Sequence, residues 1–363
     1  MTILFFTDSL GAGGAQRQLV GLAVLLKEQG YDVKVCTYYS FDFYRQYLED
    51  NGVSNEIIPS AANRRKRIFA VRKYFKREKP DWVIAYQETP SLVSCIAKIL
   101  GCDFKLLVSE RNTTQTLCFS NRLRFQLYHF VEAIVPNSYS QERFLINRYS
   151  WMKDKIHVVT NFVDLEKFHF VNHKKRKIPE IIIPASLMPS KNALGFIKAC
   201  AILKEKGVKF HVKWFGISLN CLEYHSKCIE LINKYSLQND VCLLEKTKEI
   251  DKKYQEADFL CLPSFFEGTP NVICEALSTG LPIMCSNVCD NSFYVQEDVN
   301  GVLFNPKNPQ DIAEKIEIMM SISDEKYEQY RIASRKIAER KLCKQEFLNK
   351  YLNIIQEQHD DKK

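Results

Sequence analysis

Residues 257–286 read ADFLCLPSFFEGTPNVICEALSTGLPIMCS, and this stretch predicts a strand, a short helix and a second strand. The apolar runs ADFLCLPS and LPIMCS at its two ends are typical of buried strands. Between them Thr269 and Pro270 suit a helix start, and Gly280 falls where a left-handed C-terminal cap is expected. Two strands joined through a helix predict parallel pairing within one sheet.

The same alternation of strand and helix continues along the chain. Strand-like segments in the first half include ILFFTD (3–8), DWVIAYQ (81–87) and IHVVTN (156–161), and the alternation restarts with EIIIPASL (180–187) after the charged run HKKRK. It predicts an α/β protein with two doubly wound, Rossmann-like domains, residues 1–172 and 173–345, that face each other across a cleft. A continuous helical tail is expected from about Ser323, with residues 346–363 packing back on the N-terminal domain.

Length and composition indicate a globular protein with full cores. The chain has 363 residues, of which 46% are hydrophobic and 26% charged. Its 13 cysteines show no spacing typical of a zinc site, so we expect buried thiols in a reducing compartment. No apolar run is long enough to span a membrane and the N-terminus reads as a strand, not a signal peptide, so we expect a cytoplasmic protein.

The positive charge is concentrated in the first half of the chain. Residues 1–177 carry 27 Lys and Arg against 17 Asp and Glu, a net charge of +10, whereas the remainder carries −2. Much of the excess lies in RRKRIFAVRKYFKREK (64–79), whose apolar positions recur at helical spacing. This segment predicts an amphipathic basic helix that is either an ordinary surface helix or a contact with an anionic surface.

Two loops that follow strands have the features of ligand sites. Glu267 precedes the predicted helix start and Glu275 lies about a turn and a half into the helix, whose first-turn amides favour an anion such as a phosphate. On spacing alone, a purely structural interpretation, in which one glutamate caps the helix and the other is solvated, fits as well as the interpretation as a ligand site. In the other loop, Gly13 and Gly14 allow backbone amides to approach a ligand closely, although neither a dinucleotide-binding nor a Walker motif is present.

Three segments together resemble the retaining, bacterial polysaccharide-type glycosyltransferases of family 4, which have the GT-B fold. They are LGAGGAQRQL (10–19), VVTNFVDLEKF (158–168) and FEGTPNVICEALSTGLPIM (266–284). The resemblance implies that Glu275 binds the ribose hydroxyls of a nucleotide-sugar and that Glu267 and the following amides hold the donor sugar and its diphosphate. The implied donor-binding residues are Gly13, Gly14, Lys191, Glu267, Gly268, Thr269, Pro270, Asn271, Val272 and Glu275.

The chain departs from this family at the site of the leaving group. Members usually carry an arginine five residues before the lysine; here Lys191 is kept but Ser186 takes the arginine position. Arg17 and Arg111 are candidates for the missing charge, and the cleft is expected to include Glu110, Arg111 and Asn112 of the SERN segment. The resemblance implies Lys191 and Glu267 as catalytic residues. Because the chain has no Asp-x-Asp pair, we expect neither a metal nor another cofactor.

The resemblance implies a retaining enzyme of class EC 2.4 that moves a hexose or N-acetylhexosamine from a nucleotide diphosphate sugar, expected to be a UDP-sugar. The basic N-terminal half suits a lipid-linked acceptor in surface polysaccharide or lipopolysaccharide synthesis, with peripheral binding at the inner face of the cytoplasmic membrane. The alternatives are a nucleotide-sugar epimerase of similar fold and a non-catalytic nucleic-acid-binding protein. Nothing in the sequence resembles a module that reads nucleic acid, so no nucleic-acid partner is expected.

Overall fold

The computed structural model describes residues 1–114, 116–217 and 222–360. The chain forms two compact units, Met1–Asn161 with the chain from Gln345 onward, and Phe162–Lys344. The first unit therefore ends earlier than the expected residue 172. Val163 and Phe168 explain the difference, because both are buried in the core of the second unit and the Phe168 ring packs edge-on against Tyr254 at 5.9 Å.

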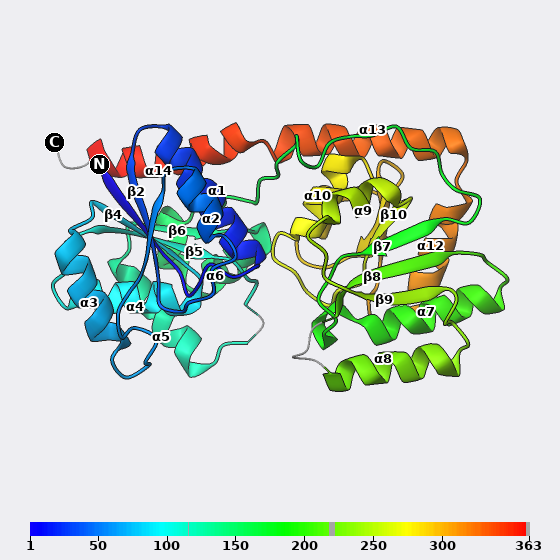
Figure 1. Ribbon diagram of the computed structural model, residues 1–363, viewed down its shortest axis with the longest axis horizontal. Helices are drawn as coiled ribbons and strands as arrows, with labels where there is room; N and C mark the ends of the chain where they lie inside the picture. Colours follow the sequence, from blue (N-terminus) through cyan, green and yellow to red (C-terminus); the bar gives the residue numbers. More distant parts are fainter. Residues whose placement is uncertain (115, 218–221, 361–363) are drawn as a thin grey trace. The chain divides into compact units, whose positions relative to one another are not determined.

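The first unit contains a six-stranded parallel sheet in the order β3-β2-β1-β4-β5-β6. Helices α3, α4 and α5 cover one face, and α1, α2 and α14 cover the other (Figure 1). The strands are β1 (Thr2–Phe6), β2 (Asp32–Thr37), β3 (Ser54–Ile57), β4 (Trp82–Tyr86), β5 (Lys105–Glu110) and β6 (Ala133–Pro136). The helices are α1 (Gly14–Glu28), α2 (Arg45–Asp50), α3 (Arg67–Glu78), α4 (Glu88–Ile99), α5 (Phe119–Leu127), η1 (Tyr128–Phe130), α6 (Tyr139–Arg148), η2 (Ser150–Lys155) and α14 (Lys344–Asp360).

The second unit repeats this plan with a six-stranded parallel sheet in the order β12-β11-β10-β7-β8-β9. Helices α7, α8 and α12 pack together, as do α9, α10 and α13 on the other face (Figure 1). The strands are β7 (Glu180–Ile183), β8 (His211–Ile217), β9 (Val241–Glu245), β10 (Phe259–Leu262), β11 (Ile283–Ser286) and β12 (Gly301–Phe304). The helices are η3 (Pro189–Lys191), α7 (Ala193–Glu205), α8 (Leu222–Lys234), α9 (Ile250–Glu256), α10 (Asn271–Thr279), α11 (Asn291–Tyr294), α12 (Pro309–Ser321) and α13 (Asp324–Lys341).

Both sheets have the same doubly wound order when read from the first strand of each unit. The direction of winding reverses between β1 and β4 in the first unit and between β7 and β10 in the second. In open parallel sheets, ligands bind beyond the carboxyl ends of the strands at such a reversal. The loops that follow these four strands are therefore where a ligand is expected.

The structure confirms the strand, helix and strand predicted for residues 257–286, since β10 and β11 pair in parallel. The helix start is shifted by one residue: α10 begins at Asn271 with Pro270 as its N-cap residue, so Thr269 is not the cap. The prediction of a strand at 156–161 was wrong. Only Ile156 makes a bridge, and the sixth strand of the sheet is β6. The helical tail is not continuous, because it is interrupted between α13 and α14.

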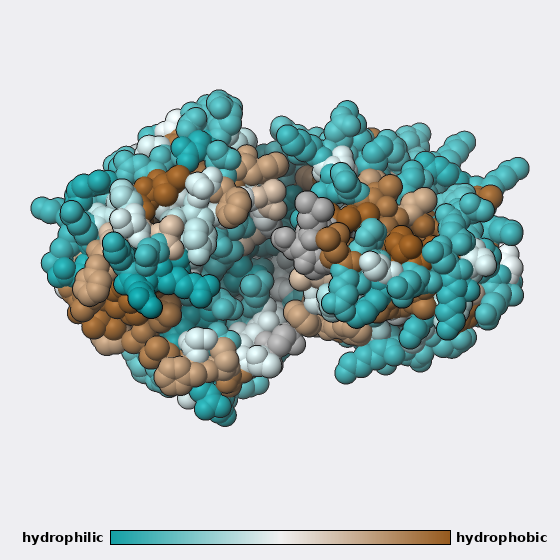
Figure 2. Space-filling view, turned by 60° about the horizontal axis from the view of Figure 1, so that its bottom comes forward, coloured by the Kyte–Doolittle hydropathy of each residue, from teal (hydrophilic) through white to brown (hydrophobic). Residues whose placement is uncertain are grey.

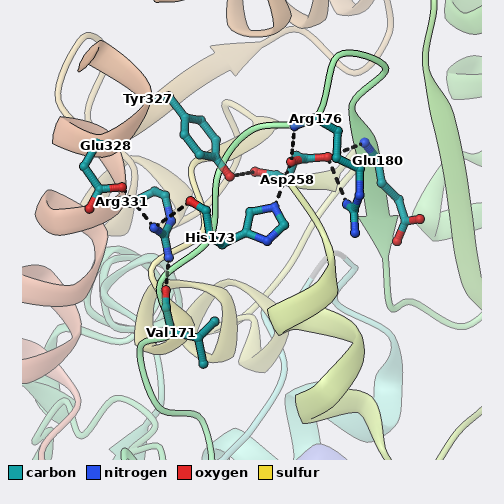
Figure 3. Close-up of polar contacts among 8 residues, drawn as sticks. All are labelled: Val171, His173, Arg176, Glu180, Asp258, Tyr327, Glu328 and Arg331. Atoms are coloured by element: carbon teal, nitrogen blue, oxygen red, sulfur yellow. Dashed lines mark hydrogen bonds and ion pairs between the residues drawn. The ribbon is translucent and has the colours of Figure 1, made fainter. Parts of the chain in front are cut away.

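A buried aspartate anchors the segment that leads into the second sheet (Figure 3). Asp258 is fully buried just before β10, and its carboxylate accepts hydrogen bonds from His173 Nε2 (2.8 Å), the Arg176 side chain (3.1 Å) and the backbone amide of Glu180 (2.7 Å). Arg331 of α13 donates to the carbonyl oxygen of His173 at 3.0 Å. Burial opposes ionisation, but these hydrogen bonds and the Arg176 charge lower the pKa of Asp258 below the ordinary aspartate value.

Candidate active site

Two of the residues expected to act in catalysis meet at the strand reversal of the second sheet. Lys191 follows β7 and Glu267 follows β10, and Lys191 Nζ lies 2.5 Å from Glu267 Oε1. The two loops are also joined through the backbone, because the amide of Phe265 donates to the carbonyl oxygen of Ser190 at 2.9 Å. Both charged side chains are largely buried, so their pairing is less screened than a surface ion pair.

The local backbone explains how Lys191 reaches this position. The loop after β7 passes so close to β8 that a Cβ atom at Gly216 would lie 1.9 Å from the Ala185 carbonyl oxygen, which only glycine permits. Lys191 then ends the single turn η3, and Asn192 adopts a left-handed conformation (φ 58°) while its side-chain amide donates to the Pro306 carbonyl oxygen at 2.7 Å. Lys191 is therefore held at the end of a rigid turn.

The helix start expected to bind an anion follows directly in the chain. The amides of Ile273 and Cys274 both donate to the carbonyl oxygen of Pro270, so the amides of residues 271 and 272 precede the first hydrogen bond of α10. Gly280 ends the helix in the predicted left-handed conformation, with φ 79°. A phosphate at the start of α10 would meet backbone amides and the positive end of the helix dipole, and Lys191 pairs with Glu267 four residues before this helix.

Glu275 is a buried carboxylate inside α10. Its side chain is only 4% exposed, and the hydroxyl of Tyr254 donates a hydrogen bond to Glu275 Oε2 at 2.8 Å. Tyr254, which lies in α9, was not predicted from the sequence as a site residue. No signal could have identified it, since a tyrosine in a short helix reads as an ordinary core residue. The bond orients a carboxylate whose two oxygens suit a pair of adjacent hydroxyls.

The remaining candidates lie in the first unit. Gly13 is the N-cap residue of α1, which begins at Gly14, and a side chain at Gly13 would collide with Gln16, whose own side chain donates to Asp8 at 3.1 Å. Arg17 is half-buried in the first turns of α1. This glycine-rich loop follows β1, at the strand reversal of the first sheet.

The SERN segment places its charged residues in different environments. Glu110 is buried at the end of β5 and accepts hydrogen bonds from Arg124 (3.2 Å) and from the hydroxyl of Tyr128. Burial raises the pKa of Glu110, against the lowering effect of Arg124 and Tyr128. Arg111 is buried beyond the strand end, and Asn112 is exposed. Glu110 therefore belongs to an internal polar network.

Eight of the ten expected donor-binding residues lie within the second unit, and Gly13 and Gly14 do not. Lys191 contacts Glu267, and residues 268–275 continue from it through the start of α10. Ser186 is half-buried in the same loop as Lys191. The first-unit candidates follow other strands in a separate sheet; they are Gly13, Gly14, Arg17, Glu110, Arg111 and Asn112.

Comparison with known proteins agrees with this arrangement. The family model described as Glycosyltransferase Family 4 matches residues 12–167, and the one described as Glycosyl transferases group 1 matches residues 164–337. The chain is 27% identical over 338 residues to a Campylobacter jejuni GalNAc-alpha-(1->4)-GalNAc-alpha-(1->3)-diNAcBac-PP-undecaprenol alpha-1,4-N-acetyl-D-galactosaminyltransferase, covering 88% of this chain and 89% of the relative. Over 47% of this chain and 46% of the relative, it is 30% identical to an Escherichia coli UDP-Gal:alpha-D-GlcNAc-diphosphoundecaprenol alpha-1,3-galactosyltransferase.

Solved structures show the same fold over almost the whole chain. Anabaena Alr3699/HepE in complex with UDP-glucose superposes with a TM-score of 0.86 at 18% identity, covering 98% of this chain and 100% of the other. A glycosyltransferase from Rickettsia africae gives a TM-score of 0.85 at 19% identity and covers 98% of both chains. The two family matches together run from residue 12 to residue 337. The chain belongs to the group 1, family 4 glycosyltransferases and has the GT-B fold.

Proposed function

We propose that the protein transfers a hexose or N-acetylhexosamine, with retention of configuration, from a UDP-sugar to a lipid-linked glycan during surface polysaccharide or lipopolysaccharide synthesis. The observation that carries this proposal is the Lys191–Glu267 ion pair at the strand reversal, beside a helix start and the buried Glu275. Together these groups suit one nucleotide-sugar. Glu275 would bind the ribose, the α10 amides and Lys191 the diphosphate, and Glu267 the sugar.

The named activities of relatives support the choice of substrates. The Escherichia coli relative is a UDP-Gal-dependent transferase to a diphosphoundecaprenol-linked sugar, and the Campylobacter jejuni relative acts on an undecaprenol-linked glycan. The Anabaena structure holds UDP-glucose. We extend the donor and acceptor class from these proteins to this chain.

The proposed reaction needs no metal and no covalent intermediate. As the bond to the leaving diphosphate breaks, negative charge builds on that group, and Lys191 together with the start of α10 stabilises it. Glu267 pairs with Lys191, and in this proposal it also contacts the donor sugar. The departing phosphate oxygen takes the proton from the acceptor hydroxyl on the same face, so the protein contributes positioning and electrostatics.

We further propose that α3 brings the enzyme to an anionic membrane surface, the inner face of the cytoplasmic membrane. Arg64, Arg65 and Lys66 are exposed before the helix, and Phe69 on its first turns is 71% exposed. Figure 2 brings forward the face that carries α3, α4 and α5, where hydrophobic residues gather among hydrophilic ones. Basic and aromatic side chains together suit a lipid interface. Among the described residues, no helix is long and apolar enough to cross a membrane.

Arg67 is an exception within this basic segment. It is 7% exposed, its Nε donates to the Ala61 carbonyl oxygen at 2.8 Å, and its guanidinium lies 3.9 Å from the centre of the Tyr38 ring. Arg67 therefore holds the start of α3 in place and does not contribute to a surface contact.

A thermal-shift screen against UDP, GDP and dTDP sugars tests the donor assignment. A bound donor stabilises the folded state by mass action, so UDP-sugars should raise the melting temperature in a concentration-dependent way. An epimerase would also bind them, but would convert the free UDP-sugar without an acceptor. Absence of any shift with the whole panel would contradict the proposed function.

A further inference from the structure

The first unit has an open pocket at the edge of its sheet opposite to the loops that are expected to bind substrate. The pocket has a volume of about 560 Å³ and is lined by α5 and η1 on one side and by the end of α6 and η2 on the other. η1 precedes β6, and η2 precedes Ile156, which bridges in parallel to Ile134 of that strand. Both turns therefore lie at the amino edge of the sheet, whereas open parallel sheets bind their substrates beyond the carboxyl edge.

The pocket is lined by cationic and polar side chains, and none of its described lining residues is acidic. Arg122 and Gln126 lie one turn apart on α5, and His129 follows in η1. Arg148 is the last residue of α6. Both arginines are exposed, and their side chains form no hydrogen bond or ion pair with another residue in the described part of the chain. Two positive charges therefore line one pocket without a carboxylate to neutralise them.

Contacts that do not involve the two arginines hold the wall of the pocket in place. The His129 ring stacks on Trp151, with 3.6 Å between the ring centres and 13° between the planes. Lys155 Nζ donates to the His129 carbonyl oxygen at 2.9 Å, which ties η2 to η1. The Tyr149 ring packs against the buried Phe125 ring at 5.6 Å. Because this wall is already ordered, binding of a ligand costs little conformational entropy.

Helix dipoles explain only part of this arrangement. Arg148 lies in the last turn of α6, where a cation interacts favourably with the helix dipole. Arg122 lies near the start of α5, where the dipole gives a positive charge no advantage. Two arginines that reach one pocket from two helices are therefore the feature that indicates an anionic ligand.

We propose that Arg122 and Arg148 bind the phosphate group of a phosphate ester, at a site separate from the donor site. A guanidinium matches two phosphate oxygens with parallel hydrogen bonds. The Gln126 side-chain amide and the His129 imidazole can donate further hydrogen bonds to the same group. The ligand is not a substrate of the proposed transfer, because the pocket lies at the amino edge of the sheet.

Two sources offer this chemistry: the headgroup of an anionic phospholipid and a soluble phosphorylated metabolite. Phe119 is 82% exposed and Leu123 is 43% exposed, one turn apart on α5 and beside Arg122. They lie on the face with α3 and α4, where hydrophobic residues gather (Figures 1 and 2), and they suit the acyl chains of a lipid. Only this choice of source rests on the proposed membrane contact of α3, whereas the phosphate site itself does not.

Titrations of the full-length protein with glycerol 3-phosphate and with monomeric dihexanoyl phosphatidylglycerol test the proposal. Arg122→Gln and Arg148→Gln should each weaken binding by about tenfold, the lower end of the range for a charge-assisted hydrogen bond, because both arginines are exposed to water. The matched control is Arg143→Gln, which removes an exposed arginine of α6 outside the pocket and should leave binding unchanged. Parent affinity in both pocket variants, an equal loss in the control, or no binding of either probe to the parent would overturn the proposal.

The two probes also distinguish the sources. A lipid source predicts tighter binding of phosphatidylglycerol than of glycerol 3-phosphate, and Phe119→Ser/Leu123→Ser should remove this preference. A soluble source predicts equal binding and no effect of that double variant; either result supports the phosphate site. The probes carry no nucleotide and form no membrane surface, so failure of the donor site or of the α3 contact would leave their binding intact.

Trp151 provides a readout that is specific to this pocket. The chain has three tryptophans, and the other two, Trp82 and Trp214, are fully buried. The bound probe should change the tryptophan fluorescence of the parent, and the change should be absent in Trp151→Phe, which keeps an aromatic ring against His129. A change of equal size in Trp151→Phe would place the bound probe elsewhere and overturn the assignment of the pocket.

Discussion

Replacing Glu275 by glutamine tests the assignment of the ribose site. The side chain keeps its size and its hydrogen bond from Tyr254, so folding should survive, but the charge and one acceptor oxygen are lost. Since Glu275 is only 4% exposed, water screens its interactions little. A hydrogen bond to a charged group contributes about 1.5–3 kcal/mol, so we expect UDP to bind about tenfold to a hundredfold more weakly.

Calorimetric titration with UDP and with 2′-deoxy-UDP provides the decisive comparison. If Glu275 binds the ribose hydroxyls, the parent protein should prefer UDP, and Glu275→Gln should lose most of this preference. Tyr254→Phe is an internal control: it leaves the carboxylate in place but removes the bond that orients it, so a smaller loss of about 0.5–1.5 kcal/mol is expected. Unchanged binding of UDP by Glu275→Gln, or an equal loss for both nucleotides, would refute the assignment.

Three further predictions follow from the proposed mechanism, the basic helix and the buried aspartate. Lys191→Ala should lower kcat more than donor affinity, because its charge matters most as the leaving group becomes negative, and activity of the parent should persist in EDTA; rescue by magnesium after EDTA treatment would contradict this. Replacing Arg64, Arg65 and Lys66 by glutamine, with Arg67 kept, should abolish most sedimentation with anionic vesicles at low salt, since each charge contributes about 1 kcal/mol; equal recovery of parent and variant would leave α3 an ordinary surface helix. Asp258→Asn should reduce the free energy of unfolding at pH 7 by about 1–3 kcal/mol. Because the pKa of Asp258 is lowered in the folded state, its contribution is lost as pH falls, so the gap in urea unfolding between parent and variant should shrink below about pH 4, and a gap that grows there would contradict the role.

The sequence by itself determined the fold class and the order of the segments that carry the candidate residues of the second unit, because both depend on local order along the chain. Long apolar runs separated by helices dictate parallel strands, and a strand, a loop with Glu267 and a helix with Glu275 lie in consecutive positions. Short strands are hard to predict, because few residues show the apolar pattern. Strand β6 has only four residues and was not predicted, whereas the apolar segment 156–161 was wrongly predicted to be a strand. The compact units divide at residue 161, earlier than the expected 172, and composition does not show that Val163 and Phe168 are buried in the core of the second unit.

Only the tertiary structure decided which charged side chains form ion pairs or are buried and which are exposed. Glu110 and Arg111 are adjacent in the sequence, yet Glu110 pairs with Arg124 inside the first unit, whereas Arg111 forms no ion pair with any described residue. In the same way, Arg67 is buried, donates a hydrogen bond to Ala61 and contacts the Tyr38 ring, whereas Arg64 is exposed. Which side chains form hydrogen bonds or ion pairs depends on residues far apart in the chain, such as Tyr254 and Glu275. A local sequence pattern does not show which of these residues come together in space.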